Sequence, residues 1–339
     1  MNGHSMDAWV VEEYGGPDAF ERTEVDRPTP GPEEVLLRVR ASSVNPVDAK
    51  IRRGDLPAFA PDSPRILGCD VAGVVEAVGD DVTAFEAGDE VYGMPGGVTG
   101  SQGALADYQV AHADTLAPVP NGLSLREAAT LPVVGLTAWE LLVDSADVGE
   151  DDSVLVYGGT GGVGHAAVQV ARWCGARKVV ATGSSARKRE LAVELGADAT
   201  VDYGSASVEE YVAEHTDGEG FDVVVDTVGN DHLPTAFEAV APYGTVLTTE
   251  TSSSGDVDFG ALQADCLTLG VTLAIRPVIE DADRSHIGTR LRRLSRLVEN
   301  GRLEPLVDER TFAFAEVSEA HARLEAGEAV GKISLVRER

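Results

Sequence analysis

A glycine-rich loop carries the strongest chemical signal in this sequence. The apolar residues 154–157 lead into glycines at positions 159, 161 and 164, and residues 165–172 follow with the composition of a helix. Gly159 permits a tight turn, Gly161 lets the backbone approach a ligand closely, and Gly164 lets the helix pack against the strand. Because the first amides of such a helix are free to bind an anion, the pattern predicts a pyrophosphate cradle for a dinucleotide. The predicted cradle consists of Gly159, Thr160, Gly161, Gly162, Val163 and Gly164.

The residues after the next strand bear on which dinucleotide binds. Residues 178–182 form a second apolar segment and complete a βαβ unit, which a merely flexible glycine loop would not need. An NAD site usually places Asp or Glu about 20 residues beyond the glycines to accept a ribose hydroxyl. Residues 183–189 contain no acidic side chain, and a carboxylate there would repel a 2′-phosphate. We therefore expect NADPH; the alternative is a solvated helix start with a serine N-cap. The candidate phosphate ligands are Ser184, Ser185, Arg187 and Lys188.

The composition is strongly acidic, with 57 Asp and Glu residues against 27 Lys and Arg and a formal net charge of −30. Such a charge repels nucleic acid, so we expect no nucleic-acid partner. It also keeps a protein soluble at high salt, which favours a salt-adapted protein over a merely acidic one. The sequence has no apolar run long enough to span a bilayer, and its three cysteines are scattered. We expect a cytoplasmic protein in a reducing compartment, without a membrane partner.

The pattern of elements changes twice along the chain. Residues 1–126 read as short strands separated by Gly and Pro, which predicts a β-rich domain. Residues 127–279 alternate helical and strand segments, which predicts an α/β domain with a doubly wound parallel sheet of the Rossmann type. Residues 280–339 are expected to return to the first domain.

Further motifs resemble one known family along nearly the whole chain. They are Asn-Pro-Val-Asp at residues 45–48, Leu-Gly-Cys-Asp at 67–70, Gly-Asp-Glu-Val at 88–91, Leu-Thr-Ala-Trp at 136–139 and the glycine loop. In this order and spacing the sequence resembles the medium-chain dehydrogenase/reductase superfamily, within it the zinc-free quinone oxidoreductase branch that includes zeta-crystallin. The resemblance implies a GroES-like catalytic domain in the β-rich part. It also implies a homodimer in which the last Rossmann strand, expected at residues 271–275, pairs with its copy.

The resemblance sets an expectation about metal. Zinc-dependent relatives have a cysteine at the position of Asn45 and a histidine–glutamate pair at the positions of Cys69 and Asp70. A catalytic zinc needs about three protein ligands, so we expect no metal here. The chemistry that fits is direct hydride transfer from NADPH to a quinone or an α,β-unsaturated carbonyl. The alternatives are an alcohol dehydrogenase of the same superfamily and a low-turnover, crystallin-like NADPH-binding protein.

The resemblance implies catalytic roles for single residues. Asn45 would donate from its amide to the acceptor carbonyl, or else form a turn before Pro46. Thr137 would lie near the nicotinamide, or else be a plain helix residue. Lys50 stands where such relatives often have tyrosine, and it would stabilise an oxyanion or help proton delivery, or else point to solvent from a helix.

Further cofactor contacts rest on the resemblance alone. Tyr203 would lie near the adenine ribose phosphate, or else be a surface aromatic. Residues 228–230, namely Val228, Gly229 and Asn230, would line the adenosine side, and Lys332 would approach the cofactor. The acceptor itself is not identified, because the loops at residues 55–62 and 248–258 that shape the pocket have no conformation derivable from the sequence.

Overall fold

The computed structural model describes residues 5–229, 232–249, 257–280 and 282–337 of the chain. Its contacts divide the chain into two units. The first unit consists of Met1–Leu136, Ile275–Gly301 and Val307–Arg339, and the second of Thr137–Ala274 and Arg302–Leu306. Asn230 and most of the loop at residues 248–258, which the sequence places near the cofactor and the acceptor, lie outside the described residues.

The boundary between the first unit and the second differs from the predicted boundary after residue 126. Residues 127–136 belong to the first unit. The backbone N–H of Val133 donates to the carboxylate of Asp70 over 2.8 Å, which ties this segment to the β-rich domain. A helical pattern in the sequence does not show which domain the helix packs against.

The return to the first unit also differs from the prediction. It begins at Ile275 rather than residue 280, and it is interrupted by Arg302–Leu306, which joins the second unit. There the Gln169 amide exchanges two hydrogen bonds, of 2.8 and 2.9 Å, with the backbone of Glu304. Contacts between residues so distant in sequence are not visible in local patterns.

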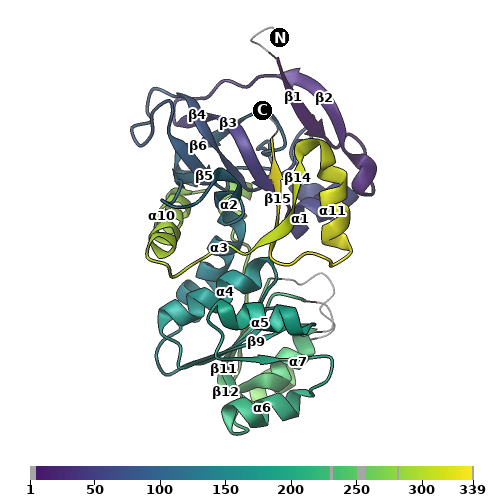
Figure 1. The fold of residues 1–339 in the computed structure, drawn as a ribbon, viewed down its shortest axis with the longest axis vertical. Coiled ribbons are helices and arrows are strands. Elements are labelled where there is room, and N and C mark those ends of the chain that lie inside the picture. Colours follow the sequence, from purple (N-terminus) through teal and green to yellow (C-terminus); the bar gives the residue numbers. More distant parts are fainter. Residues whose placement is uncertain (1–4, 230–231, 250–256, 281, 338–339) are drawn as a thin grey trace. The chain divides into compact units, whose positions relative to one another are not determined.

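A seven-stranded sheet forms the centre of the first unit (Figure 1). Its long strand β3 (Glu34–Ser43) is largely buried and pairs antiparallel with three neighbours. The order across the sheet is β14 (Val307–Ala313), β15 (Lys332–Val336), β3, β4 (Val71–Val78), β5 (Glu90–Gly93) and β7 (Leu116–Pro118), with β6 (Tyr108–His112) also on β3. Strands β1 (Ser5–Val10) and β2 (Glu21–Asp26) form a separate antiparallel pair. In this register the end of β3 lies between the starts of β4 and β15.

One long helix and several short ones complete the first unit. The amphipathic helix α10 (Ser285–Glu299) buries Ile287, Leu291 and Leu294, whose spacing places them on one face. The buried Tyr92 hydroxyl of β5 donates to the Leu291 carbonyl over 2.8 Å, which ties this helix to the sheet. The other helices are η1 (Pro17–Ala19), α1 (Pro46–Arg53), η2 (Pro57–Phe59), η3 (Ala113–Thr115), α2 (Leu125–Ala128), α9 (Arg276–Ile279), η5 (Phe314–Glu316) and α11 (Val317–Glu325).

The second unit is a parallel six-stranded sheet with helices beside it, as predicted (Figure 1). The strand order is β10 (Ala199–Val201), β9 (Lys178–Thr182), β8 (Ser153–Tyr157), β11 (Phe221–Asp226), β12 (Val240–Thr248) and β13 (Thr268–Val271). Numbered from β8 as the first strand, this is the 3-2-1-4-5-6 order of a doubly wound dinucleotide fold. Of the central strands, β8 is fully buried and β11 is buried except at Asp222, and both are rich in valine, which is typical of a parallel sheet covered on both faces.

The helices of the second unit follow the strands in regular alternation. They are α4 (Gly162–Cys174), α5 (Ala186–Glu194), α6 (Val208–Thr216), α7 (His232–Ala239) and α8 (Phe259–Ala264). Helix α3 (Pro132–Trp139) crosses the boundary between the units and continues into a π-helical turn, η4 (Glu140–Ser145). Among the described helices, none is long and apolar enough to cross a membrane.

The edge strand of this sheet is shorter and earlier than predicted. Strand β13 ends at Val271, whereas the sequence suggested a strand over residues 271–275. Its partner β12 ends at Thr248, opposite Val271, so the paired ladder stops there. The chain then turns into α9, whose second residue is Pro277.

Candidate functional site

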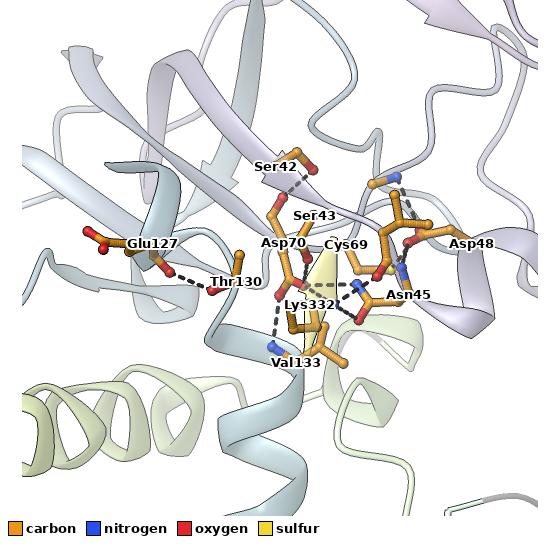
Figure 2. Close-up of polar contacts among 12 residues, drawn as sticks. Ser42, Ser43, Asn45, Asp48, Cys69, Asp70, Glu127, Thr130, Val133 and Lys332 are labelled. Carbon is orange, nitrogen blue, oxygen red and sulfur yellow. Dashed lines mark hydrogen bonds and ion pairs between the residues drawn. The ribbon is translucent and has the colours of Figure 1, made fainter. Parts of the chain in front are cut away.

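A buried polar cluster lies in the first unit, where β3, β4, β15 and the start of α1 meet (Figure 2). Asn45 stands directly before α1, Cys69 and Asp70 stand directly before β4, and Lys332 begins β15. Each of these side chains is at most 3% exposed, and the same holds for Asp48. The strand pairing therefore brings together residues from three distant parts of the chain.

The carboxylate of Asp70 is the centre of this cluster. Its Oδ2 accepts from Ser43 Oγ at 2.5 Å, from Asn45 Nδ2 at 2.9 Å and from Lys332 Nζ at 3.3 Å. Its Oδ1 accepts from the backbone N–H of Val133 at 2.8 Å. A buried carboxylate is tolerated only with such compensation, and these four donors supply it for Asp70.

The amide of Asn45 is oriented by two charged neighbours. Lys332 Nζ donates to Asn45 Oδ1 at 2.5 Å, and Asn45 Nδ2 donates to Asp70. Asn45 also starts α1, where its backbone N–H donates to Asp48 Oδ2 at 2.8 Å. The residue therefore combines the helix-start position that Pro46 suggests with side-chain contacts to the cluster.

Cys69 and Asp48 form a second hydrogen-bonded pair in the cluster. The Cys69 thiol donates to Asp48 Oδ1 over 3.4 Å, and the backbone N–H of Gly68 donates to the same oxygen over 3.2 Å. Burial raises the pKa of the Asp48 carboxyl to about 6, although the hydrogen bond from Asn45 opposes the shift. Burial also raises the pKa of the Cys69 thiol well above its usual value, and the nearby Asp48 and Asp70 carboxylates add to this effect. Cys69 is therefore a neutral thiol.

These side chains do not suit a zinc ion. Zinc binds the thiolate form of cysteine, whereas the surroundings of Cys69 favour the thiol. The Asp70 carboxylate is already bound by Lys332, a cation held at the same oxygen that Asn45 contacts. Within the described ranges, no group of three or more His, Cys, Asp and Glu side chains is arranged to hold a metal.

The other two predicted catalytic residues, Lys50 and Thr137, lie on helices α1 and α3. Lys50 is half-buried on α1, and its backbone carbonyl accepts from the N–H of Asp55 at 2.9 Å. Thr137 is 6% exposed on α3 and is assigned to the second unit. The structure thus joins Asn45 to Lys332, a residue that the sequence associated with the cofactor rather than with Asn45.

The glycine loop lies between β8 and α4 in the second unit, as predicted. Gly158 has φ +70°, and a Cβ at Gly159 would lie 2.5 Å from the Cβ of Ala181 on β9. A Cβ at Gly164 would lie 2.0 Å from the Gly158 carbonyl oxygen. A Cβ at Gly161 would lie 3.2 Å from the same carbonyl oxygen, a tight contact but a less severe one than those at Gly159 and Gly164. Thr160 is buried and Gly162 and Val163 open α4.

The loop after β11 borders the glycine loop. The buried Asp226 carboxylate accepts from the N–H groups of Val228 and Gly229, at 3.0 and 2.9 Å. This holds the turn so that Val228 lies beside Gly158, whose Cβ would come within 3.1 Å of the valine side chain. Tyr203 follows β10 and is 46% exposed, with its ring edge on His232 at 5.8 Å between centroids. The side chains of Val228 and Tyr203 are therefore exposed and accessible to a ligand at this edge of the sheet.

One of the two serines after β9 caps the next helix, as in the alternative interpretation of this segment. Ser185 Oγ accepts from the backbone N–H of Lys188 at 3.3 Å, so Ser185 is the N-cap of α5, and Ser184 is exposed beside it. Arg187 lies on the outer face, 65% exposed, with Glu190 and Glu194 at 3.6 and 3.5 Å. Capping uses one serine oxygen and does not occupy Ser184 or the Lys188 ammonium.

Sequence reasoning missed one residue of this segment. Arg189 Nη1 donates to the carbonyl of Gly183 at 3.2 Å and is 2.8 Å from Asp202 Oδ2. Gly183 follows β9 and Asp202 follows β10, so Arg189 lies at the carboxyl edge of these strands. The run Arg187-Lys188-Arg189 gave a basic signal, but which of the three faces the strand ends depends on helix register.

Comparison with known families agrees with this architecture. Residues 31–121 match the alcohol dehydrogenase GroES-like domain, and residues 162–276 match the zinc-binding dehydrogenase domain. A quinone oxidoreductase of Pseudomonas aeruginosa is 35% identical over 95% of this chain and 97% of its own length. A chloroplastic NADPH-dependent alkenal/one oxidoreductase of Arabidopsis thaliana is 33% identical, covering 97% of this chain and 78% of its own.

The fold comparison gives the same result. The crystal structure of an alcohol dehydrogenase superfamily protein from Novosphingobium aromaticivorans superimposes with a TM-score of 0.92 and 41% identity, covering 98% of this chain and 100% of the other. Its agreement extends over both units, as does that of the two curated relatives. The chain is therefore an oxidoreductase that belongs to the medium-chain dehydrogenase/reductase superfamily, with a GroES-like domain and a Rossmann domain.

Proposed function

We propose that this protein is a zinc-independent, NADPH-dependent reductase that transfers hydride to a quinone or an α,β-unsaturated carbonyl. The observation that carries the proposal is the set of contacts among Asn45, Asp70 and Lys332. Asn45 and Asp70 stand where zinc-dependent relatives have a cysteine and a glutamate, and here they bind each other and Lys332. The names of two similar proteins, a quinone oxidoreductase and an NADPH-dependent alkenal/one oxidoreductase, support this acceptor class.

The second unit supplies the features that a bound dinucleotide would need. The loop of Gly159, Thr160, Gly161, Gly162, Val163 and Gly164 leads into the N-terminus of α4, where free amides favour a pyrophosphate. Ser184, Ser185, Arg187 and Lys188 are proposed to bind the 2′-phosphate, and Tyr203, Val228 and Gly229 to line the adenosine side. Bound NADPH would supply the hydride. The absence of an acidic residue in 183–189 favours NADPH over NADH.

Asn45 is proposed to act on the acceptor. A carboxamide nitrogen carries two hydrogens, and the contact with Asp70 uses one of them. The second is available to donate to the acceptor oxygen as negative charge develops there during hydride transfer. Lys50 is proposed to assist with charge or proton delivery, and Thr137 to contact the nicotinamide.

The alternatives make different predictions. A zinc-assisted alcohol dehydrogenase needs a donor set that Cys69 and Asp70 do not offer in their present contacts. A low-turnover binding protein would bind NADPH without reducing any acceptor. No contact in the described structure favours either alternative over the reductase.

We further propose a homodimer built on the free edge of the Rossmann sheet. Strand β13 pairs only with β12 among the described strands, and its Val271 is 59% exposed. Phe259 and Leu273 nearby in sequence are 75% and 42% exposed. An exposed apolar edge strand is commonly covered by another chain, and a second copy of this chain would cover it.

We also propose that the protein acts in a reducing compartment such as the cytoplasm. The cysteines Cys69, Cys174 and Cys266 are free, which supports this proposal.

A screen of NADPH consumption tests the proposed function. We expect oxidation of NADPH with quinones, 2-alkenals or enones, and no reduction of NADP⁺ with simple alcohols. Asn45→Ala is expected to lower the rate of hydride transfer about 100-fold while NADPH binding changes little, since it removes one oxyanion donor. Tight NADPH binding with no turnover on any acceptor would instead support the binding-protein alternative.

A further inference from the structure

We propose that Lys332 is a positioning residue whose buried ammonium orients and polarises the amide of Asn45. This inference rests on the role proposed above for Asn45. The Lys332 ammonium donates to Val44 O at 2.9 Å, Asn45 Oδ1 at 2.5 Å and Asp70 Oδ2 at 3.3 Å. An ammonium has three hydrogens, so these three acceptors account for its whole donor capacity within the cluster.

The ammonium decides which way the carboxamide points. The oxygen and nitrogen ends of an asparagine side chain have similar shapes, and only hydrogen-bond partners distinguish them. Lys332 can only donate, so it selects the oxygen end, and the Asp70 carboxylate can only accept, so it selects the nitrogen end. The remaining N–H of Asn45 is therefore held in one direction.

The same two contacts make the Asn45 N–H a stronger donor. A cation at the amide oxygen and an anion at one N–H both favour the charge-separated form of the amide, in which the nitrogen end is positive. The residues are at most 3% exposed, so water does not screen this effect. A preorganised donor of this kind stabilises an oxyanion without rearranging during the reaction.

A double-mutant cycle tests the inference. We expect Lys332→Met and Asn45→Ala each to lower kcat about 10-fold to 100-fold, with the NADPH dissociation constant unchanged within about twofold. If Lys332 acts through Asn45, the double variant is no slower than the slower single variant. Losses that multiply in the double variant would overturn the inference, as would a kcat that Lys332→Met leaves unchanged while NADPH binding weakens.

Two additions keep the test decisive. Lys332→Met leaves the buried Asp70 carboxylate without a cation, and this variant is at risk of not folding. If it does not fold, the double variant Lys332→Met with Asp70→Asn is used in its place, because it removes both charges. A spectroscopic readout does not depend on turnover: the side-chain ¹⁵N–H signals of Asn45, identified by their loss in Asn45→Ala, should shift in the Lys332 variant. Unchanged signals would contradict the polarisation, whereas a shift with no acceptor reduced by the parent enzyme would sink the proposed function alone.

A second inference, carried by different contacts, concerns the nucleotide. We propose that Arg189 is a specificity-determining residue for the 2′-phosphate and that Asp202 is its counter-ion in the free protein. This inference rests on the proposed use of NADPH. Arg189 Nη1 is fixed at the carboxyl edge by Gly183 O at 3.2 Å and by Asp202 Oδ2 at 2.8 Å. Its side chain is 24% exposed, compared with 65% for Arg187, which contacts Glu190 and Glu194 instead.

Arg189 lies where the 2′-phosphate of a bound NADPH is expected. In a doubly wound sheet the adenosine ribose lies beyond the end of the second strand, here β9, which ends one residue before Gly183. The Arg189 side chain passes over that glycine, whose Cβ would lie 3.0 Å from Arg189 Cγ. A guanidinium in this place pairs well with a phosphate, and it keeps the Asp202 carboxylate bound and partly neutralised.

Nucleotide titrations of three variants test this second inference. Arg189→Ala is expected to weaken NADPH binding about 10-fold and leave NADH binding unchanged. Asp202→Asn is expected to tighten NADPH binding severalfold, because the phosphate no longer competes with a carboxylate. Arg172→Ala is the matched control, since Arg172 forms a similar 3.2 Å pair with Asp198, before rather than after β10. If Arg189→Ala lowers the affinity for both nucleotides equally, or for neither, the inference is overturned. If the parent enzyme binds NADH more tightly than NADPH, the NADPH assignment is overturned as well.

Discussion

The ammonium of Lys332 lies 2.5 Å from the amide oxygen of Asn45, although 287 positions separate the two residues in the sequence. The contact exists because β15, which begins at Lys332, pairs with the end of β3, two residues before Asn45. The C-terminal segment therefore completes the polar cluster rather than merely covering the sheet. It also neutralises Asp70, which would otherwise be a buried charge without a cation.

Removing the carboxylate of Asp70 should destabilise the protein. Asp70→Ala leaves the Lys332 ammonium buried without its anion, which costs about 3–5 kcal/mol of unfolding free energy. Asp70→Asn keeps a hydrogen-bonding side chain and is expected to lose less. Urea unfolding measures both, with Asp114→Ala, at a 54% exposed side chain, as a control expected within about 0.5 kcal/mol of the parent. Equal stability of Asp70→Ala and the parent protein would show that the ion pair is not compensating a buried charge.

Two glycine substitutions separate folding from nucleotide binding. Gly164→Ala places a Cβ 2.0 Å from the Gly158 carbonyl oxygen, so it should lower the unfolding free energy by about 1–3 kcal/mol. Gly161→Ala, at φ −77°, places a Cβ 3.2 Å from the same oxygen, so it should cost less stability than Gly164→Ala while weakening NADPH binding about 10-fold or more. Gly149→Ala, with no atom within 4 Å of the added Cβ, is the control. A Gly161→Ala variant that binds NADPH normally would contradict the pyrophosphate assignment.

The basic residues of α5 should distinguish the two nicotinamide nucleotides. Arg187→Ala with Lys188→Ala is expected to weaken NADPH binding about 10-fold and to leave NADH unaffected, because only NADPH carries the 2′-phosphate. Fluorescence titration of each nucleotide gives the two dissociation constants. Equal weakening for both nucleotides would mean that these side chains serve the helix rather than the phosphate.

Acid should destabilise the first unit partly through His321. Burial, with a smaller contribution from Arg52, lowers the pKa of this histidine to about 3, against about 6.5 in the unfolded chain. The folded-state pKa is depressed, so the stability that neutral His321 allows is present above pH of about 6.5 and is lost as the pH falls towards 3. In urea unfolding, the parent should lose about 1.4 kcal/mol per pH unit relative to His321→Gln between pH of about 6 and 4. Parallel curves for the two proteins would show that His321 titrates normally.

The features predicted best from the sequence depend on local patterns. The glycine loop, the flanking β8 and α4 and the parallel sheet follow from glycine positions and apolar periodicity within a few dozen residues. The GroES-like domain followed from motif order over the whole chain and is confirmed by its family match. The catalytic role of Asn45 stays a prediction, made from residue type and position without knowledge of its partners.

The features that the sequence did not show depend on long-range register. The family resemblance alone places Lys332 near the cofactor, which stays a prediction. Nothing in the neighbouring sequence points to its contact with Asn45, which only the pairing of β15 with β3 reveals. Arg189 was passed over because helix register decides that it, rather than Arg187, faces Asp202. The edge strand was placed too late because its end is set by its partner at Thr248. The salt adaptation suggested by the net charge of −30 stays a prediction.

The most direct measurement of the central claim is the rate of NADPH oxidation by quinones and enones after exhaustive chelation, compared with the untreated enzyme and with enzyme supplied with zinc. Hydride transfer that relies on Asn45 and its charged neighbours should proceed at the same rate in all three samples. A rate that vanishes on chelation and returns with zinc would contradict the account.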